Sequence, residues 1–174
     1  MVNYSRVIKM ETRTRKTTRI PGYHYSDPGA YFLTMCTLDR ARLLSRIRVT
    51  GDTAVTDLLE YGRVVECEIL KMNGIYNHLR VDKYVIMPDH VHLLLTVMDP
   101  VLRNAPPEAK NSAVAKYVGT LKRFCNRKYG RNIWQKGSND HVIRNQEDYN
   151  TWWEYMEKNP MNWIITGKNG PTSP

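Results

Sequence analysis

The chain has 174 residues, 41% of them hydrophobic, and a formal net charge of +9. This length and composition are typical of one globular domain with its own core, and the positive charge favours a polyanionic partner, although a basic surface alone would also explain it. We expect a cytoplasmic protein without a membrane partner, because no apolar run approaches the roughly 20 residues that cross a bilayer and no signal peptide opens the chain. The cysteines are few, odd in number and far apart (Cys36, Cys67 and Cys125), which argues against a disulfide framework and against a thiolate zinc site.

Residues 1–20 are polar and basic and show no apolar period, so we predict a flexible arm. Its basic side chains could contact DNA phosphates, and the candidates are Arg13, Arg15, Lys16 and Arg19. An ordinary disordered terminus is an equal alternative. Tyr23, which follows a Pro-Gly turn signal, could stack on a base.

The remaining pattern predicts a strand, a helix, two strands, a helix, a short-strand region and a final helix. The predicted ranges are 31–37, 52–72, 79–87, 90–97, 112–129, 141–144 and 147–159, with a basic connection over 40–48. Gly62 lies inside the first helix, where we expect close packing on the sheet. The order of elements predicts an α+β fold, a ferredoxin-like antiparallel sheet with helices packed on it. We assign residues 21–167 to this single domain and 168–174 to a tail.

One face of the second predicted helix is basic. Lys116, Arg123 and Arg127 fall together on this face at seven- and four-residue spacing. The face could follow a nucleic-acid backbone, and a solvated basic face is the equally weighted alternative.

The strand over 90–97 carries two histidines that are two residues apart. Because side chains alternate along a strand, His90 and His92 point to one face and Val91, Leu93 and Leu95 to the other. A His-x-His pair on a strand can bind a metal ion from two positions. The alternative is a hairpin whose histidines face water.

The final helix places Tyr155 outside the apolar stripe, with Asn159 four residues later on the same side. Pro160 disfavours helical geometry at Asn159, so we expect the helix to end there. Two imidazoles and an amide oxygen would suit Mg²⁺ or Mn²⁺, with phosphate oxygens as further ligands. Tyr155 could equally be a packing residue, and Asn159 a helix-terminal cap.

These residues resemble the REP-associated tyrosine transposases, which belong to the single-tyrosine HUH (His-hydrophobe-His) transposases. The resemblance rests on an ordered set of motifs over about residues 19–165. The motifs are Pro21-Gly22-Tyr23, Met87-Pro88-Asp89-His90-Val91-His92, Trp134-Gln135, Ile143-Arg144 and Tyr155-Met156-Glu157-Lys158-Asn159-Pro160.

The resemblance implies a role for each matching residue. His90, His92 and Asn159 would be the metal ligands, and Tyr155, carried on the C-terminal helix, would be the nucleophile. The implied activity is metal-dependent nicking and joining of single-stranded DNA beside palindromic hairpins, through a 5′-phosphotyrosine and without ATP. The implied location is the nucleoid of a bacterial cytoplasm. Whether the protein is a monomer or a homodimer is left open.

Two other functions compete with this one. The first is a hairpin-DNA-binding protein of the same fold without catalysis. The second is a zinc-dependent hydrolase built on the histidine pair, which would need another ligand and a general base; no His-Glu-x-x-His element is present.

Overall fold

The computed structural model describes residue 25, residues 27–98 and residues 112–166. The predicted arm (1–20) and tail (168–174) lie outside these residues and stay predictions. The described chain forms a four-stranded sheet from β1 (Gly29–Cys36), β4 (Leu79–Ile86), β5 (His90–Val97) and β6 (Asn139–Val142). A separate hairpin is made of β2 (Ser45–Thr50) and β3 (Thr53–Leu58).

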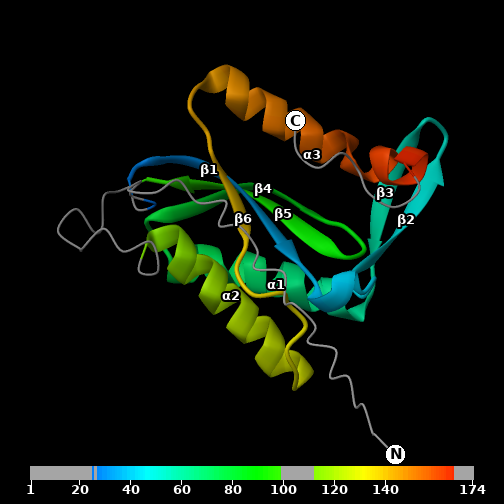
Figure 1. Cartoon of the computed structure of the whole chain (residues 1–174), viewed down its shortest axis with the longest axis horizontal. Coiled ribbons are helices and arrows are strands. Elements are labelled where there is room, and N and C mark those ends of the chain that lie inside the picture. The colour runs from blue at the N-terminus through cyan, green and yellow to red at the C-terminus, as the bar shows by residue number, and fades with distance from the viewer. Residues whose placement is uncertain (1–24, 26, 99–111, 167–174) are drawn as a thin grey trace, which may run out of the picture.

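The sheet has the order β4-β5-β1-β6, and every neighbouring pair is antiparallel. α1 (Glu60–Ile75) and α2 (Ala113–Tyr129) cover one face of it, whereas α3 (Gln146–Thr166) lies on the other face (Figure 1). This arrangement confirms the predicted ferredoxin-like α+β fold with a C-terminal helix that carries Tyr155. Within the described residues, no helix combines the length and the apolarity needed to pass through a bilayer.

The main core lies between the sheet and the pair α1 and α2. Val91, Leu93 and Leu95 of β5 point into it and are fully buried, as the alternation predicted. α2 is bounded by local signals. The Ser112 side chain accepts a hydrogen bond from the Ala115 amide at 3.1 Å, and the helix ends at Gly130 in the left-handed conformation.

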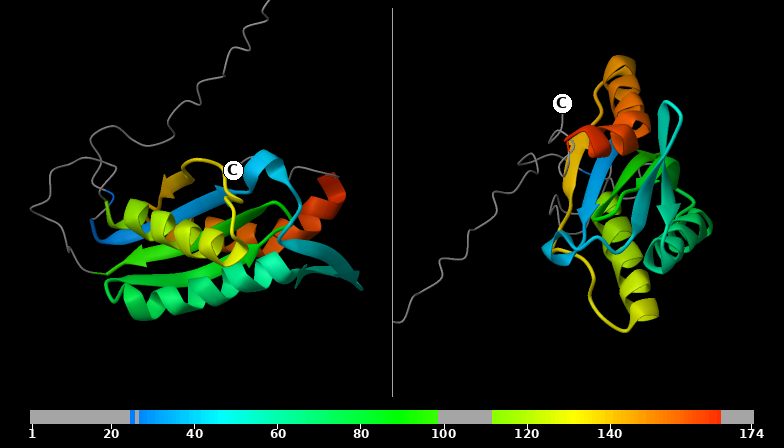
Figure 2. Two further views of the ribbon diagram at one scale, coloured as in Figure 1. Left: turned by 90° about the horizontal axis from the view of Figure 1, so that it is seen from below. Right: turned by 90° about the vertical axis from the view of Figure 1, so that its right-hand side faces the viewer.

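The prediction of a helix from residue 52 was wrong in its first part. Residues 45–58 form the β2–β3 hairpin, whose turn uses Gly51 at φ 59°, and α1 begins only at Glu60. Val55 and Leu58 match a helical period, but the β-branched residues around a Gly-Asp turn favour paired strands. Figure 2 shows this hairpin projecting from the sheet beside the C-terminal end of α3.

Gly62 does permit a close contact, but not with the four-stranded sheet. A Cβ atom at this position would lie 2.0 Å from the backbone oxygen of Leu44, in the segment that leads into β2. That oxygen also accepts a hydrogen bond from the Leu59 amide at 2.9 Å. The glycine therefore lets the first turn of α1 contact the backbone of this segment.

α3 continues through Pro160 to Thr166, so the expected end at Asn159 was wrong. Proline removes one backbone hydrogen bond and clashes with the carbonyl four residues before it, which normally kinks a helix. Figure 2 shows the red final turns of α3 at an angle to the orange part. Asn159, Pro160 and Trp163 are all buried, so packing of the bent segment offsets the lost backbone bond.

Candidate active site

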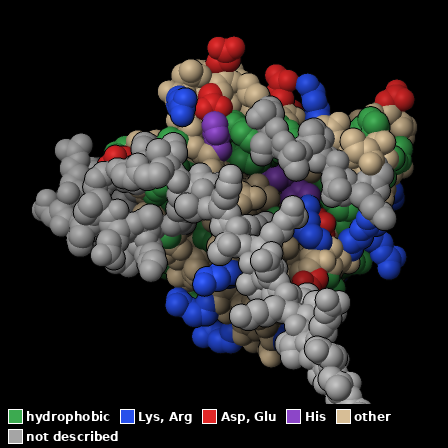
Figure 3. Space-filling view, viewed as in Figure 1, with side chains coloured by type: hydrophobic (Ala, Val, Ile, Leu, Met, Phe, Trp, Pro, Cys, Tyr) green, Lys and Arg blue, Asp and Glu red, His purple; other side chains and the backbone are tan. Residues whose placement is uncertain are grey.

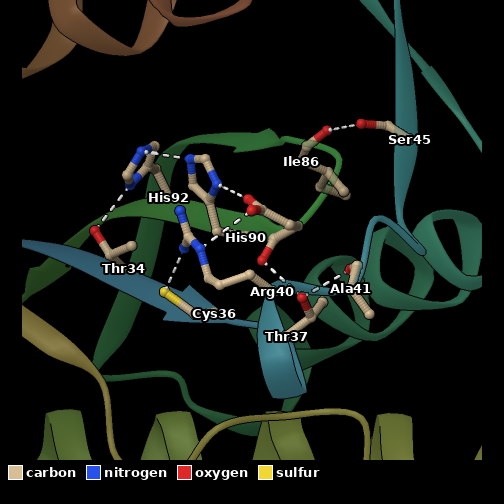
Figure 4. A network of polar contacts seen from close by, with 10 residues as sticks. Thr34, Cys36, Thr37, Arg40, Ala41, Ser45, Ile86, His90 and His92 are labelled. Carbon is tan, nitrogen blue, oxygen red and sulfur yellow. Dashed lines mark hydrogen bonds and ion pairs between the residues drawn. The ribbon is translucent and has the colours of Figure 1, made fainter. Parts of the chain in front are cut away.

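The two histidines of β5 meet on the sheet face that α3 covers. His90 and His92 are 7% and 4% exposed, and their Nε2 atoms lie 3.1 Å apart (Figure 4). The strand alternation that sends Leu93 into the main core brings these two rings together on the opposite face.

Each imidazole is held by a partner at its other nitrogen. His90 Nδ1 lies 2.6 Å from Asp89 Oδ1, and His92 Nδ1 lies 2.9 Å from Thr34 Oγ1, on the neighbouring strand. With its proton on Nδ1, donated to Asp89, His90 presents the lone pair of Nε2 towards His92, where it can bind a cation. Burial, and then electrostatic repulsion of a second positive charge by the neighbouring His90 and Arg40, keep the pKa of His92 well below its ordinary value. His92 is therefore neutral, which is the form of imidazole that binds metals.

The spacing of the pair fits two ligands of one metal ion. Two nitrogens that lie about 2.1 Å from one ion at a right angle are about 3 Å apart. In the part of the chain that the structure describes, no group of three or more His, Cys, Asp or Glu side chains is placed to hold a metal ion. Any third protein ligand would therefore be of another type, and the amide of Asn159 is the candidate that the sequence offers.

Tyr155 lies next to the histidine pair. Its ring centroid is 5.4 Å from that of His92 and 5.8 Å from that of Phe32, both in edge-to-face geometry. Its side chain forms a hydrogen bond with the buried side chain of Asn159, one helical turn later. Burial raises the pKa of the phenol, and the smaller effects of Asn159 and Arg40 do not cancel that rise. The phenol is therefore protonated near neutral pH.

The sequence pattern did not identify three residues of this site as functional. Asp89, which turn formation alone could explain, bridges His90 and Arg40, because its Oδ2 lies 3.1 Å from Arg40 Nε. Its backbone oxygen accepts hydrogen bonds from the amide and the hydroxyl of Thr37, both at 2.9 Å. Thr34 and Arg40 carry no sequence signal for this site. Thr34 lies 58 positions from His92, and Arg40 is also far along the chain from Asp89, so only the tertiary structure brings each to its partner.

The predicted DNA-binding residues that the structure describes do not lie at this site. Lys116, Arg123 and Arg127 are exposed on α2, which lies across the sheet from the histidine pair and from α3. The other candidates lie outside the described residues; these are Arg13, Arg15, Lys16, Arg19 and Tyr23. Their role in DNA binding stays a prediction.

Comparison with known proteins gives two related sequences. A protein of Haemophilus influenzae without an assigned function is 26% identical over 166 residues, which cover 86% of this chain and 89% of that protein. A REP-associated tyrosine transposase of Escherichia coli K12 is 26% identical over 95 residues, about half of each chain. No family model matches the chain.

A solved structure has the same fold. It is a REP-associated tyrosine transposase bound to a REP hairpin, and it matches with a TM-score of 0.57 and 21% identity over 80% of this chain and 70% of that one. The chain is therefore similar to REP-associated tyrosine transposases in sequence and in fold, as its ordered motifs indicated.

Proposed function

We propose that this protein is a metal-dependent DNA strand transferase that nicks and joins single-stranded DNA at palindromic hairpin repeats. The observation that carries the proposal is the position of a tyrosine of α3 against the histidine pair of β5: the Tyr155 ring lies 5.4 Å from the His92 ring, and the Nε2 atoms of His90 and His92 converge to 3.1 Å. A nucleophile and two metal-binding nitrogens on one sheet face are the parts that phosphoryl transfer to tyrosine needs.

Hairpin DNA is the proposed substrate because the chain resembles a transposase that was solved with a REP hairpin. The net charge of +9 suits a polyanionic strand. A protein that processes DNA in this way would associate with the bacterial nucleoid. The arm and the basic face of α2 are the further surfaces that we propose for binding the duplex or its flanks.

The proposed reaction exchanges one phosphodiester for another. Tyr155 Oη loses its proton and attacks the scissile phosphorus, a new phosphorus–oxygen bond forms, and the bond to the 3′ oxygen breaks. The 3′ oxygen leaves as a hydroxyl after it takes up a proton, and the 5′ phosphate stays on the tyrosine. Joining is the reverse attack by a 3′-hydroxyl, so no nucleotide cofactor is required.

His90 and His92 would hold a divalent cation, Mg²⁺ or Mn²⁺, with Asn159 as the third ligand. When bound, the ion polarises the scissile phosphate and lowers the barrier to attack. Asp89 and Thr34 orient the two imidazoles through their Nδ1 atoms, and Asn159 also orients the Tyr155 phenol.

The test is a denaturing gel assay for a covalent protein–DNA adduct. The probe is a single-stranded oligonucleotide that contains a hairpin from repeats beside the gene, with Mn²⁺ or with EDTA. We expect the wild type to form an adduct with Mn²⁺ but not with EDTA. With Mn²⁺, Tyr155→Phe and His90→Ala should form no adduct, and the control Tyr149→Phe should form one.

Each alternative predicts a different gel. An adduct that persists in Tyr155→Phe places the nucleophile on another residue. Tight hairpin binding without any adduct supports the non-catalytic DNA-binding protein. Strand cleavage that needs no tyrosine and depends on Zn²⁺ supports the hydrolase.

A further inference from the structure

The connection between β1 and β2 has an unusual backbone beside the histidine pair. Asp39 and Arg40 both adopt left-handed conformations, at φ 53° and φ 56°. Residues with a Cβ rarely adopt this conformation, and two in succession cost conformational free energy that a glycine would avoid. Such strain is typical of positions where the side chain itself is needed, so the role of Arg40 requires an explanation.

Arg40 projects its guanidinium towards the histidine site. Nε lies 3.1 Å from Asp89 Oδ2, and Nη1 lies 2.8 Å from Cys36 Sγ. Figure 4 shows the guanidinium beside the rings of His90 and His92. Although two of its nitrogens have partners, the side chain is 41% exposed, so a ligand at the histidine pair can reach it.

Arg42 lies near the same site, against the ring of Trp163. Its guanidinium carbon lies 5.3 Å from the ring centroid of Trp163, and this ring lies 6.0 Å from that of His90. Trp163 is 7% exposed, whereas Arg42 is exposed. The buried indole therefore lies beside His90 and supports an accessible guanidinium on its ring. Figure 3 shows basic and histidine side chains next to each other on this face of the molecule.

We propose that Arg40 and Arg42 form a phosphate clamp at the histidine pair, in which Arg40 binds the reacting phosphate and Arg42 binds a neighbouring phosphate of the same strand. This inference rests on the proposed function, because it assigns the DNA contact of that site. A guanidinium presents its N–H groups in a planar fork that matches two phosphate oxygens. Fixed positive charge at the reacting phosphate also stabilises the negative charge that develops during transfer.

A purely structural role for Arg40 is the competing explanation. Arg40 could act only by holding Asp89, which in turn orients His90. In that case we expect its loss to weaken metal binding as Asp89→Asn would, and it would not matter which DNA phosphate carries a charge. The two roles therefore differ in a measurable coupling to one phosphate.

The experiment measures DNA affinity in a Tyr155→Phe background, where no adduct can form. The probe is the single-stranded hairpin oligonucleotide from repeats beside the gene, in Mn²⁺, with one phosphate at a time replaced by an uncharged methylphosphonate. Arg40→Ala, Arg40→Lys and Arg42→Ala are compared with Arg63→Ala, an exposed arginine of α1 on the opposite side of the sheet. Thermal unfolding and Mn²⁺ affinity are measured on every variant.

We expect Arg40→Ala to weaken binding about tenfold with the charged strand and less than twofold when the scissile phosphate is neutral. Arg42→Ala should also weaken binding to the charged strand, and its effect should disappear when an adjacent phosphate is neutral. Arg40→Lys should bind more tightly than Arg40→Ala, and Arg63→Ala should bind DNA like the parent protein. A loss that is equal at every phosphate, or confined to Mn²⁺ affinity, overturns the clamp.

The failure of the clamp is distinguishable from failure of the proposed function. An adduct in the wild type without coupling to any phosphate removes the clamp and leaves the enzyme. Coupling at single phosphates without an adduct supports the clamp and removes the catalytic step.

Discussion

The two faces of the four-stranded sheet are built from the same strands and serve different purposes. The face towards α1 and α2 is a large and almost wholly apolar core. The face towards α3 has a small apolar cluster, made of Phe32, Leu94, Trp152 and Met156, beside two buried histidines. In β5 the residues of these faces alternate, so Leu93 belongs to the core and Leu94 to the small cluster. One face supplies most of the apolar burial, and this allows the other to carry buried polar groups.

α3 is attached to its face by polar as well as apolar contacts. Lys83 Nζ lies 2.7 Å from Glu157 Oε1 and 4.0 Å from the ring centroid of Trp153. Asp148 accepts hydrogen bonds from the side chains of His141 and Trp152. Partly exposed polar contacts contribute less stability than a dry core, so we expect this face to be the more easily perturbed of the two by pH and by ligands.

The largest expected effect is the loss of core volume next to the site. Leu93→Ala should lower the free energy of unfolding by about 4 kcal/mol, because it leaves a cavity among fully buried neighbours. Leu94→Ala removes the same atoms one residue later, yet should cost only about 2–3 kcal/mol, since partly exposed side chains border its cluster and can relax. Urea unfolding measures both. Equal losses would show that the two faces do not differ in packing.

α1, which covers the apolar face, also depends on one close backbone approach at its first turn. Gly62→Ala should destabilise the protein by about 3 kcal/mol, because the new methyl group meets the backbone oxygen of Leu44 rather than a movable side chain. Gly119→Ala is the matched control on α2, where the space is open, and it should stabilise the protein by about 0.5–1 kcal/mol. Chemical unfolding of both variants tests the contrast. A neutral Gly62→Ala would contradict the close contact.

Divalent metal ions should stabilise the protein through the sheet face that carries His90 and His92. At 100 times its dissociation constant, Mn²⁺ should stabilise the wild type by about 2.7 kcal/mol, and His92→Ala should abolish this gain. His141→Ala is the control: it removes the histidine of β6 that is hydrogen-bonded to Asp148 of α3, and the stabilisation by Mn²⁺ should remain. Thermal unfolding with and without Mn²⁺ makes the measurement. A full response in His92→Ala would place the ion elsewhere.

The smallest expected effect is a pH dependence in the attachment of α3. Burial alone would raise the pKa of Asp148, but hydrogen bonds from His141, from the Arg144 amide and from Trp152 bring it below its ordinary value. The carboxylate therefore contributes stability that is present above the unfolded pKa of about 3.9 and is lost as the pH falls through the lower folded pKa.

Asp148→Asn should therefore cost about 1 kcal/mol at pH 7, and this cost should shrink as the pH falls below the unfolded pKa and through the folded one. Urea unfolding at several pH values follows the difference. Glu154→Gln is the control, since Glu154 forms an exposed pair with Lys158, and should change little at any pH. A cost that is the same at pH 2 and pH 7 would assign the effect to packing.

Local signals in the sequence predicted the regular elements well. The strand 90–97 and the helix 112–129 match β5 and α2 to within one residue, because strand alternation, the Ser112 cap and Gly130 act over a few residues. The segment 45–58 was predicted wrongly, since its apolar spacing fits two periods and pairing with a partner strand decides between them. The end of α3 was also wrong, because the burial of Pro160 and Trp163 outweighs the usual effect of proline.

What the sequence determined by itself is the side of the strand on which His90 and His92 lie, the ferredoxin-like order of elements and the resemblance that named Tyr155. These depend on residue type and short spacing. Only the tertiary structure decided that Thr34 and Arg40 belong to the same site, and that the basic face of α2 lies across the sheet from it. The physical reason is that strand pairing and helix packing join residues about 50 positions apart, and no local pattern encodes such contacts.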